Sequence, residues 1–339
     1  MAKFGVVVIG AGAIATNAHL PSIMKMPELE LKAVADIDLE RARHVASSMG
    51  SCLFFSDYND AIRLRDVDAV VICTPNYLHA RMAIDALKAG KHVLCEKPMA
   101  TNMVDARRMQ NFARKQRKVL MVGFTHRYTG FYTLIEEVIG QSILGRIFST
   151  RVRFAHEGPY VSWPAVSDWF FDKKKAAGGA LLDMGIHALD LVMSLFGKIE
   201  YLHAYVGTLI KPIEVEDNAT LLFRTDEGII GTIDVSWTSQ SYIGGIEIYG
   251  TDGSMLVDYG RDTVFLYVKE KRGKYPKGWN EVDAHWGSPY QNEMRCFVDA
   301  ITGKNANYPG GKEGSLSLAV ALSAYESARK RRTVRIRSD

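Results

Sequence analysis

A run of β-branched residues followed by two closely spaced glycines most constrains how this chain folds. Residues 6–9 read Val-Val-Val-Ile, which is typical of a strand buried on both faces of a parallel sheet. Gly10 permits a tight turn, Gly12 lets the backbone approach a pyrophosphate, and Ala15 is small enough for the next helix to pack against the strand. Because the N–H groups at the start of a helix bind anions, this stretch predicts a phosphate-binding turn.

An acid follows the second predicted strand, residues 31–35. Asp36 lies 24 residues beyond Gly12, about where a dinucleotide site has the acid that binds the adenosine ribose. Its carboxylate would accept both ribose hydroxyls and repel a 2′-phosphate, which favours NAD over NADP. NADP stays possible, because Arg41 and Arg43 could bind that phosphate, although such charges usually lie on a solvated helix face. The alternative is a flavodoxin-like domain without a dinucleotide.

Length and composition are those of an ordinary globular protein. The 339 residues suggest two domains, with 47% apolar and 24% charged residues. The net charge of +4 indicates no nucleic-acid partner, which would need a clustered basic face. The four cysteines form no C-x-x-C pair and no zinc-type spacing, so we expect no metal and a reducing cytoplasm. We see no signal peptide and no apolar run near the ~20 residues of a membrane span, and we expect no membrane partner.

Alternating apolar runs and helical patterns predict a doubly wound sheet of six strands. The predicted strands are residues 6–9, 31–35, 53–55, 69–73, 92–95 and 119–122, and the predicted helices are residues 15–26, 39–49, 77–89 and 103–116. Thr74-Pro75-Asn76 ends the fourth strand, at the sheet edge where open α/β sheets bind ligands.

Glu96-Lys97-Pro98 follows the fifth predicted strand. A lysine at the carboxyl end of a central strand is poorly placed to be a solvated surface charge. Burial and a cationic nicotinamide would lower its pKa and make it a proton-transfer or hydroxyl-polarising group. The alternative is a surface ion pair between Lys97 and Glu96.

A polar stripe interrupts an otherwise apolar helix predicted at residues 178–196. A helix that is apolar nearly all round is buried. Asp183, His187 and Asp190 are spaced by four and three residues, so they share one face. Buried polar groups pair within the core or serve a ligand. Together with the preceding glycines and Lys97, the stripe favours a functional site over a core His–Asp pair.

The rest of the second half predicts a sheet with helices. Strands are expected at residues 199–208, 218–224, 229–236, 243–249 and 254–258, and helices at residues 291–301 and 314–329. One sheet face would lie under helices, and apolar positions on the other would favour oligomer formation. The basic run at residues 329–332 complements a helix C-terminus rather than a nucleic acid.

An aromatic segment before the polar helix has two readings. Its rings could stack on a sugar, or they could be core or subunit contacts: Tyr160, Trp163, Trp169, Phe170 and Phe171. Candidate substrate contacts are Arg127, Tyr128, His156 and Trp163.

Short motifs spread over most of the chain resemble the Gfo/Idh/MocA family, named after glucose–fructose oxidoreductase and inositol dehydrogenase. They are residues 10–15, His19-Leu20-Pro21, residues 73–76 with His79, Glu96-Lys97-Pro98, residues 123–128, residues 178–187 and the turn at residues 250–254. The resemblance implies a Rossmann domain followed by an α+β domain with a large open, mostly antiparallel sheet. We therefore predict an NAD(P)-binding domain at residues 1–123 and a substrate-binding and oligomerisation domain at residues 124–339.

The resemblance also implies an activity and a site. The activity is NAD(P)-linked oxidation or reduction of a sugar, cyclitol or related polyol, by a homodimer or homotetramer built on the C-terminal sheet. Lys97, Asp183 and His187 would flank the reacting carbon, and Pro98 is often cis in the family. The expected cofactor contacts are Gly10, Gly12, Ala13, Ile14, Asp36, Thr74, Pro75, Asn76, His79, Glu96 and Lys97. The chain departs from the family at Ala177, where many members have a third glycine.

The mechanism expected from this site is hydride transfer from a carbinol carbon to nicotinamide C4. His187, with an ordinary pKa near ~6.5, would take the hydroxyl proton. Lys97 would stabilise the developing negative charge, and Asp183 would bind a substrate hydroxyl or orient this machinery. The alternatives are NAD-assisted glycoside hydrolysis and a non-catalytic nucleotide sensor.

Overall fold

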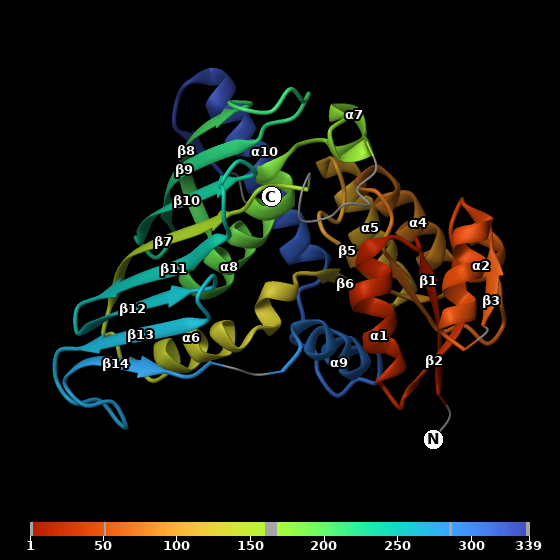
Figure 1. The fold of residues 1–339 in the computed structure, drawn as a ribbon, viewed down its shortest axis with the longest axis horizontal. Helices are drawn as coiled ribbons and strands as arrows, with labels where there is room; N and C mark the ends of the chain where they lie inside the picture. Colours follow the sequence, from red (N-terminus) through yellow and green to blue (C-terminus); the bar gives the residue numbers. More distant parts are fainter. Residues whose placement is uncertain (1–2, 51, 160–167, 285–286, 337–339) are drawn as a thin grey trace. The chain divides into compact units, whose positions relative to one another are not determined.

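The computed structural model of the chain describes residues 3–50, 52–159, 168–284 and 287–336 (Figure 1). Contacts within the chain divide it into two compact units. The first unit comprises Met1–Thr125, Lys174–Ala176 and Ser288–Leu318, and the second comprises His126–Lys173, Ala177–Gly287 and Ala319–Asp339. The predicted boundary between residues 123 and 124 separates a cofactor-binding domain from a substrate-binding domain, and this assignment of functions stays a prediction.

The first unit contains the predicted six-stranded parallel sheet, in the order β3-β2-β1-β4-β5-β6 (Figure 1). Its strands are β1 (Phe4–Ile9), β2 (Leu29–Ala35), β3 (Leu53–Phe55), β4 (Ala69–Ile72), β5 (His92–Glu96) and β6 (Leu120–Gly123). The residues of β1 from Val6 to Val8 are fully buried, as expected of a strand covered on both faces. The strand order reverses between β1 and β4, which is where open sheets of this kind bind ligands.

Helices connect these strands, and a further helix of the unit comes from later in the chain. They are η1 (Ala15–His19) with α1 (Leu20–Met24), α2 (Leu39–Ser48), α3 (Tyr58–Ile62), α4 (Asn76–Lys88), α5 (Met103–Gln116) and, from later in the chain, α9 (Pro289–Ile301). The α1 helix packs with α9, and α4 packs with α5. Asp38 and Asn102 cap α2 and α5 by accepting hydrogen bonds from backbone N–H groups, as residues before a helix commonly do.

The predicted helix at residues 15–26 is in fact two pieces, because η1 is a π-helical turn. Pro21 lies in the first turn of α1 and has no N–H to donate to the preceding turn. Short π-helical segments often lie at functional positions, and this one ends at His19, whose role is described below.

The second unit is built on a nine-stranded sheet, in the order β14-β13-β12-β11-β7-β10-β9-β8-β15. The pairing is antiparallel except between β7 and β10, which run parallel. The strands are β7 (Ile147–Ala155), β8 (Ile199–Gly207), β9 (Asn218–Thr225), β10 (Ile230–Ser236), β11 (Ile243–Gly250), β12 (Gly253–Asp258), β13 (Thr263–Val268), β14 (Gly278–Val282) and β15 (Val334–Arg335). A large, mostly antiparallel sheet was predicted, and it is confirmed.

Helices lie against one face of this sheet. They are α6 (Gly130–Gly140), η4 (Leu181–Gly185) with α8 (Ile186–Phe196), and the later part of α10 (Gly311–Lys330) (Figure 1). In β9 the side chains alternate, with Leu221 and Phe223 buried and Leu222 exposed. Large apolar side chains of the strands are exposed on Tyr205, Leu222, Ile230, Ile243, Phe265, Tyr267 and Trp279.

One helix of the chain is long and apolar enough, by length and composition alone, to be compared with a membrane span. Among the described residues, the helical stretch Lys173–Phe196 has 24 residues, and its most apolar 18-residue window has a mean hydropathy of 1.4. However, 78% of its most apolar window is buried inside the fold. A core helix has this combination of length, composition and burial.

Candidate active site

The glycine turn joins β1 to η1. Gly10 has φ +93°, and a Cβ on it would lie 2.7 Å from the carbonyl oxygen of Cys73, so only glycine fits there. A Cβ on Gly12 would meet no protein atom within 4 Å. Packing within the chain therefore does not require glycine at position 12, and the backbone there is open to the approach of a pyrophosphate. Ala13 is exposed and Ile14 half-buried on the same turn.

The Asp36 carboxylate ties the end of β2 to this turn. Its Oδ2 accepts a hydrogen bond from the Ala11 N–H at 2.8 Å, and its Oδ1 accepts one from the Asp38 N–H at 2.9 Å. Arg41 Nη1 lies 3.5 Å from Asp36 Oδ1. The next residue, Ile37, is 94% exposed and was not singled out from the sequence. An acid and an exposed apolar side chain thus stand together beside the glycine turn.

The basic residues considered for a 2′-phosphate have acidic partners. Arg41 contacts Asp38 as well as Asp36, and Arg43 pairs with Glu40. This pairing agrees with the sequence-based preference for NAD.

The loop after β4 is fixed by side-chain contacts. Thr74 Oγ1 lies 3.4 Å from Met82 Sδ, Pro75 precedes α4 as its N-cap, and Asn76 Nδ2 donates to the carbonyl oxygen of Ala176 at 3.1 Å. The turn places these residues at the carboxyl end of β4, as the sequence predicts.

His79, a predicted cofactor contact, lies between two loops. Its imidazole is 1% exposed, with Nδ1 2.8 Å from the carbonyl oxygen of Pro98 and Nε2 2.7 Å from that of Thr74. Both ring nitrogens are therefore bonded to backbone, and the side chain joins two loops.

The Glu96-Lys97-Pro98 turn follows β5. The Lys97–Pro98 peptide bond is cis, which the family resemblance implied, and Lys97 is half-buried. Glu96 is buried, with Oε1 2.8 Å from His19 Nε2, and Oε2 accepts the Lys97 N–H at 3.1 Å. Glu96 is thus not a surface partner of Lys97, because it is buried and its two oxygens are bonded inside the fold.

Electrostatics keep the Glu96 carboxylate ionised. Burial raises its pKa, but the hydrogen bond and charge of His19, followed by Lys97, lower it by more, so the net pKa lies below its ordinary value. The nearby Glu293 is fully buried, and burial together with the charge of Glu96 raises its pKa well above the ordinary value. Glu293 is therefore the neutral member of the pair.

Two glycines and a buried acid shape the start of the polar helix in the second unit. A Cβ on Gly179 would lie 1.9 Å from the backbone oxygen of Glu216, and one on Gly178 would lie 2.1 Å from Tyr325 Oη. Glu216 Oε1 accepts hydrogen bonds from the N–H groups of Gly179 and Leu181 and from the Tyr325 hydroxyl. The carboxylate thereby binds the N–H groups that begin this helix.

The three residues of the polar stripe have separate partners. Asp183 Oδ2 accepts a hydrogen bond from Trp237 Nε1 at 3.2 Å, and both side chains are buried. Asp190 forms two bonds of 2.6 Å with the guanidinium of Arg127. His187 is half-buried on a helix that is otherwise largely buried.

The ring of His187 lies against that of His126, which belongs to an aromatic cluster. Its ring centroid lies 4.6 Å from that of His126, which in turn lies 4.9 Å from Phe154 and 5.9 Å from Tyr259. His126 was part of a family motif but was given no role, and Trp237 was not singled out. The contacts of His126 and Trp237 with this helix form only in the folded chain, because the two residues belong to other segments.

The candidate substrate contacts have mixed outcomes. The guanidinium of Arg127 pairs with the Asp190 carboxylate, and its contact with a substrate stays a prediction. The Tyr128 hydroxyl is buried, and His156 Nδ1 accepts the Gly158 N–H at 2.8 Å. Tyr160 and Trp163 lie outside the described residues.

Comparison with known proteins decides the family. A family profile described as "Oxidoreductase family, NAD-binding Rossmann fold" matches residues 4–124, and one described as "GFO/IDH/MocA C-terminal domain" matches residues 132–256. The chain belongs to the Gfo/Idh/MocA family. It is an NAD-binding oxidoreductase of that family, as its motifs indicated.

Relatives of this Gfo/Idh/MocA member match along nearly its whole length. Myo-inositol 2-dehydrogenase of Thermotoga maritima is 26% identical over 336 residues, 97% of this chain and 97% of the relative. A dTDP-3,4-didehydro-2,6-dideoxy-alpha-D-glucose 3-reductase of Streptomyces violaceoruber is 30% identical over 323 residues, 94% and 91% of the two chains. The solved structure of levoglucosan dehydrogenase in complex with NADH and levoglucosan has a TM-score of 0.91 at 26% identity, covering 99% of this chain and 100% of that one.

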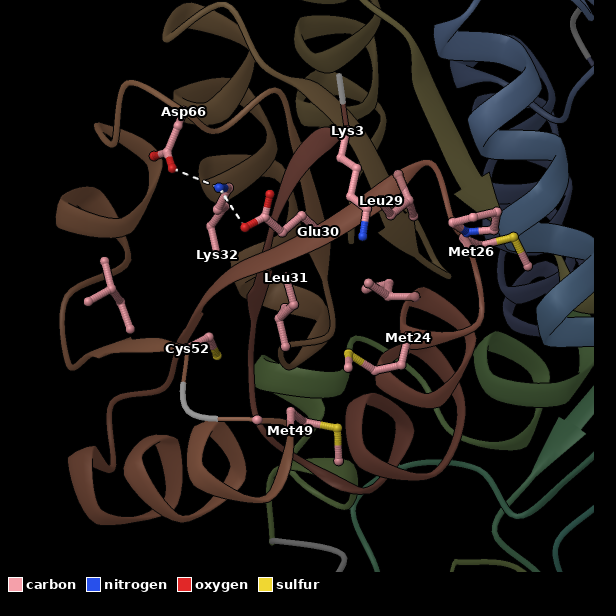
Figure 2. Close-up of a pocket in the computed structure, with 14 residues that line it drawn as sticks. Lys3, Met24, Met26, Leu29, Glu30, Leu31, Lys32, Met49, Cys52 and Asp66 are labelled. Carbon is pink, nitrogen blue, oxygen red and sulfur yellow. Dashed lines mark ion pairs between the residues drawn. The ribbon is translucent and has the colours of Figure 1, made fainter. Parts of the chain in front are cut away.

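The site residues of the first unit fit NAD. The open backbone at Gly12 suits a pyrophosphate, Asp36 suits a ribose diol, and the exposed Ile37 offers an apolar contact to an adenine. A hollow elsewhere in the first unit does not belong to this site (Figure 2). It is lined by the end of α1, the beginning of β2 and segments that precede β1, β3 and β4, among them Lys3, Leu29 and Asp66, and so lies at the opposite end of the strands from their carboxyl ends.

Proposed function

We propose that the protein oxidises a secondary hydroxyl of a sugar, cyclitol or related polyol with NAD, or reduces the corresponding carbonyl with NADH, with Lys97, Asp183 and His187 as the catalytic residues. The observation that carries the assignment of residues is the half-buried His187 on a helix whose neighbouring residues are largely buried. The named relatives support the substrate class, since they act on myo-inositol, levoglucosan and a deoxysugar nucleotide.

Each catalytic residue has a distinct task. His187 takes the hydroxyl proton as the carbinol carbon loses a hydride. The ammonium group of Lys97 donates a hydrogen bond to the same oxygen and stabilises the negative charge that develops on it. Asp183, held on one oxygen by Trp237, accepts a hydrogen bond from a substrate hydroxyl. The nicotinamide supplies the hydride acceptor when it is bound.

The surroundings of these groups suit this chemistry. The backbone of Lys97 is held by Glu96, and the ring of His187 packs against the ring of His126. Fixed donors act more strongly than mobile ones because they need no reorganisation during the reaction.

The oligomer and the compartment complete the proposal. A homodimer or homotetramer would form through the exposed face of the nine-stranded sheet, where the apolar side chains named above lie among charged ones such as Arg151 and Glu247. The four free cysteines, two of them buried, agree with a reducing cytoplasm.

A substrate panel tests the proposed function. NADH formation would be followed with myo-inositol, methyl glucosides, levoglucosan and nucleotide sugars, each with NAD and with NADP. We expect net NADH formation with at least one polyol and a preference for NAD. Product release from a glycoside without net NADH would instead indicate a hydrolase, and cofactor binding without any turnover would indicate a sensor.

A further inference from the structure

We propose that His19 and His79 are positioning residues for Lys97, because they hold the Glu96-Lys97-Pro98 turn from two sides. His19 acts through the Glu96 carboxylate, and His79 acts through the backbone carbonyl of Pro98. The inference rests on the proposed function, in which Lys97 contacts the reacting oxygen.

The first connection runs from η1 to the Lys97 backbone. His19 is fully buried, and its Nε2 lies 2.8 Å from Glu96 Oε1. The other carboxylate oxygen accepts the Lys97 N–H at 3.1 Å. One carboxylate thus links the element that follows the glycine turn to the backbone of the catalytic lysine.

Packing holds that carboxylate in place. Gly123 of the neighbouring strand β6 lies so close that a Cβ there would stand 3.3 Å from the Glu96 carboxyl group. The ring of Tyr290 meets His19 edge-on, with the centroids 5.9 Å apart. Glu96 therefore has little freedom to leave His19 or the Lys97 N–H.

The second connection runs from α4 to the Pro98 carbonyl. The His79 imidazole bridges the backbone oxygens of Pro98 and Thr74, which belong to the loops after β5 and β4. Both acceptors are carbonyls, so the two bonds together need an N–H on each ring nitrogen. Burial lowers the pKa of His79 by more than its two carbonyl partners and Glu96 raise it, so near pH 7 the ring is neutral and donates to one of the two carbonyls at a time.

Burial separates these histidines from the chemistry itself. At 1% exposure or less, neither ring can meet a substrate, so each acts only through what it holds. Exact placement matters for Lys97, because a misplacement of ~1 Å can cost about 10²-fold in rate. The sequence motifs that contain His19 and His79 thereby gain a physical role.

The first test compares a deleting and a conserving variant at position 19. His19→Leu removes the hydrogen bond to Glu96, whereas His19→Gln keeps a donor about where Nε2 lies. We expect H19L to lower kcat about 10²-fold with the Kd for NADH within about twofold of wild type, and H19Q to recover at least ~10-fold of the loss. His44→Leu, at an exposed position of α2, is the matched control and should leave kcat unchanged.

A double-mutant cycle separates positioning from general damage. In a Lys97→Ala background, H19L should cause no further loss of kcat, because the group it positions is gone. An equal loss in both backgrounds, or an unchanged kcat in H19L, would overturn the inference. If K97A itself keeps the wild-type kcat, the proposed function of Lys97 is wrong instead.

A spectroscopic readout makes the test independent of turnover. After reductive ¹³C-methylation of the lysines, the Lys97 resonance, assigned by its absence in Lys97→Arg, should differ from those of solvated lysines. We expect it to move toward them in H19L and in His79→Leu, and to return in H19Q. A Lys97 resonance unchanged in both Leu variants, in protein that keeps its melting temperature, would refute the positioning role.

Discussion

Ala177 has a left-handed backbone directly before the two glycines of the polar helix. Its φ is +67°, a conformation that costs a residue with a Cβ about 1 kcal/mol. Many family members have glycine at this position, and glycine adopts the conformation without strain. The presence of alanine in place of the family's glycine at position 177 therefore adds conformational strain to the backbone at the helix start.

Replacing Ala177 with glycine should stabilise the protein by about 1 kcal/mol at most, because the relief of strain exceeds the added flexibility of the unfolded chain. Urea unfolding of wild type and A177G measures this difference. Ala176→Gly is the matched control, since that buried residue has a negative φ and should lose stability on the same change. A destabilised A177G would show that Ala177 is not strained.

We expect Asp36 to determine which cofactor the first unit prefers. Charge-assisted hydrogen bonds contribute about 1.5–3 kcal/mol each. Asp36→Ala should therefore weaken NAD binding about 10- to 100-fold while NADP binding changes less. Fluorescence titration with NADH and NADPH measures both. Asp36→Asn is the control, because it can keep an acceptor for the Ala11 N–H without a charge to repel a 2′-phosphate. Equal losses for both cofactors in D36A would contradict the account.

Individual side chains were predictable from the sequence where short motifs contain them. Lys97 and the glycines belong to such motifs, and the structure places them at the carboxyl ends of β5 and β1. Their partners were not predictable in this way. His19 and Glu96 are 77 residues apart, and Trp237 and Asp183 are 54 apart, so their contacts exist only once the sheets have formed.

Glu216 acts on a whole element, the helix that carries Asp183 and His187. Its Oε1 accepts hydrogen bonds at 2.8 Å and 3.0 Å from the N–H groups of Gly179 and Leu181, and one at 2.7 Å from the Tyr325 hydroxyl. Burial outweighs these bonds and raises the pKa of Glu216 above its ordinary value. We therefore expect the acceptor oxygen of Glu216 to contribute more to the stability of this helix start than its negative charge does.

Glu216→Ala should destabilise the protein by about 3 kcal/mol, since three buried donors lose their acceptor at about 1 kcal/mol each. Glu216→Gln keeps an acceptor oxygen and should cost less than half as much. Urea unfolding at pH 7 distinguishes the two variants. Glu281→Gln, at an exposed position of β14, controls for the loss of one carboxylate. Equal losses in E216A and E216Q would assign the effect to charge.

Regular elements with strong patterns were predicted with small errors at their ends. Strand β3 and helix α5 have the predicted bounds. The strand β13 was not among the predicted strands. Its sequence lacks the alternation of apolar and polar residues, because the exposed Phe265 and Tyr267 alternate with the buried Val264 and Leu266. The π-helical turns η1 and η4 look like ordinary helix in sequence, since they differ only in how the backbone bonds.

For the assembled protein, the exposed face of the second unit's sheet should decide the oligomeric state. Leu222 on β9 is 58% exposed in a single chain. If this face is covered in the oligomer, Leu222→Lys buries a charge there and should weaken association at least ~10-fold. Light scattering across a dilution series measures the mass. Met24→Lys, at an exposed apolar residue of α1, should leave the mass unchanged, and an unchanged mass in L222K would refute this interface.

The transfer of an isotope label tests the catalytic assignment most directly. A polyol substrate deuterated at the carbinol carbon would be oxidised by wild type, K97A and H187A, and the reduced cofactor analysed by NMR. We predict deuterium at nicotinamide C4 in wild type and turnover lowered about 10²-fold or more in H187A, with NADH affinity nearly intact. Reduced cofactor without the label, or wild-type turnover in both variants, would contradict the account.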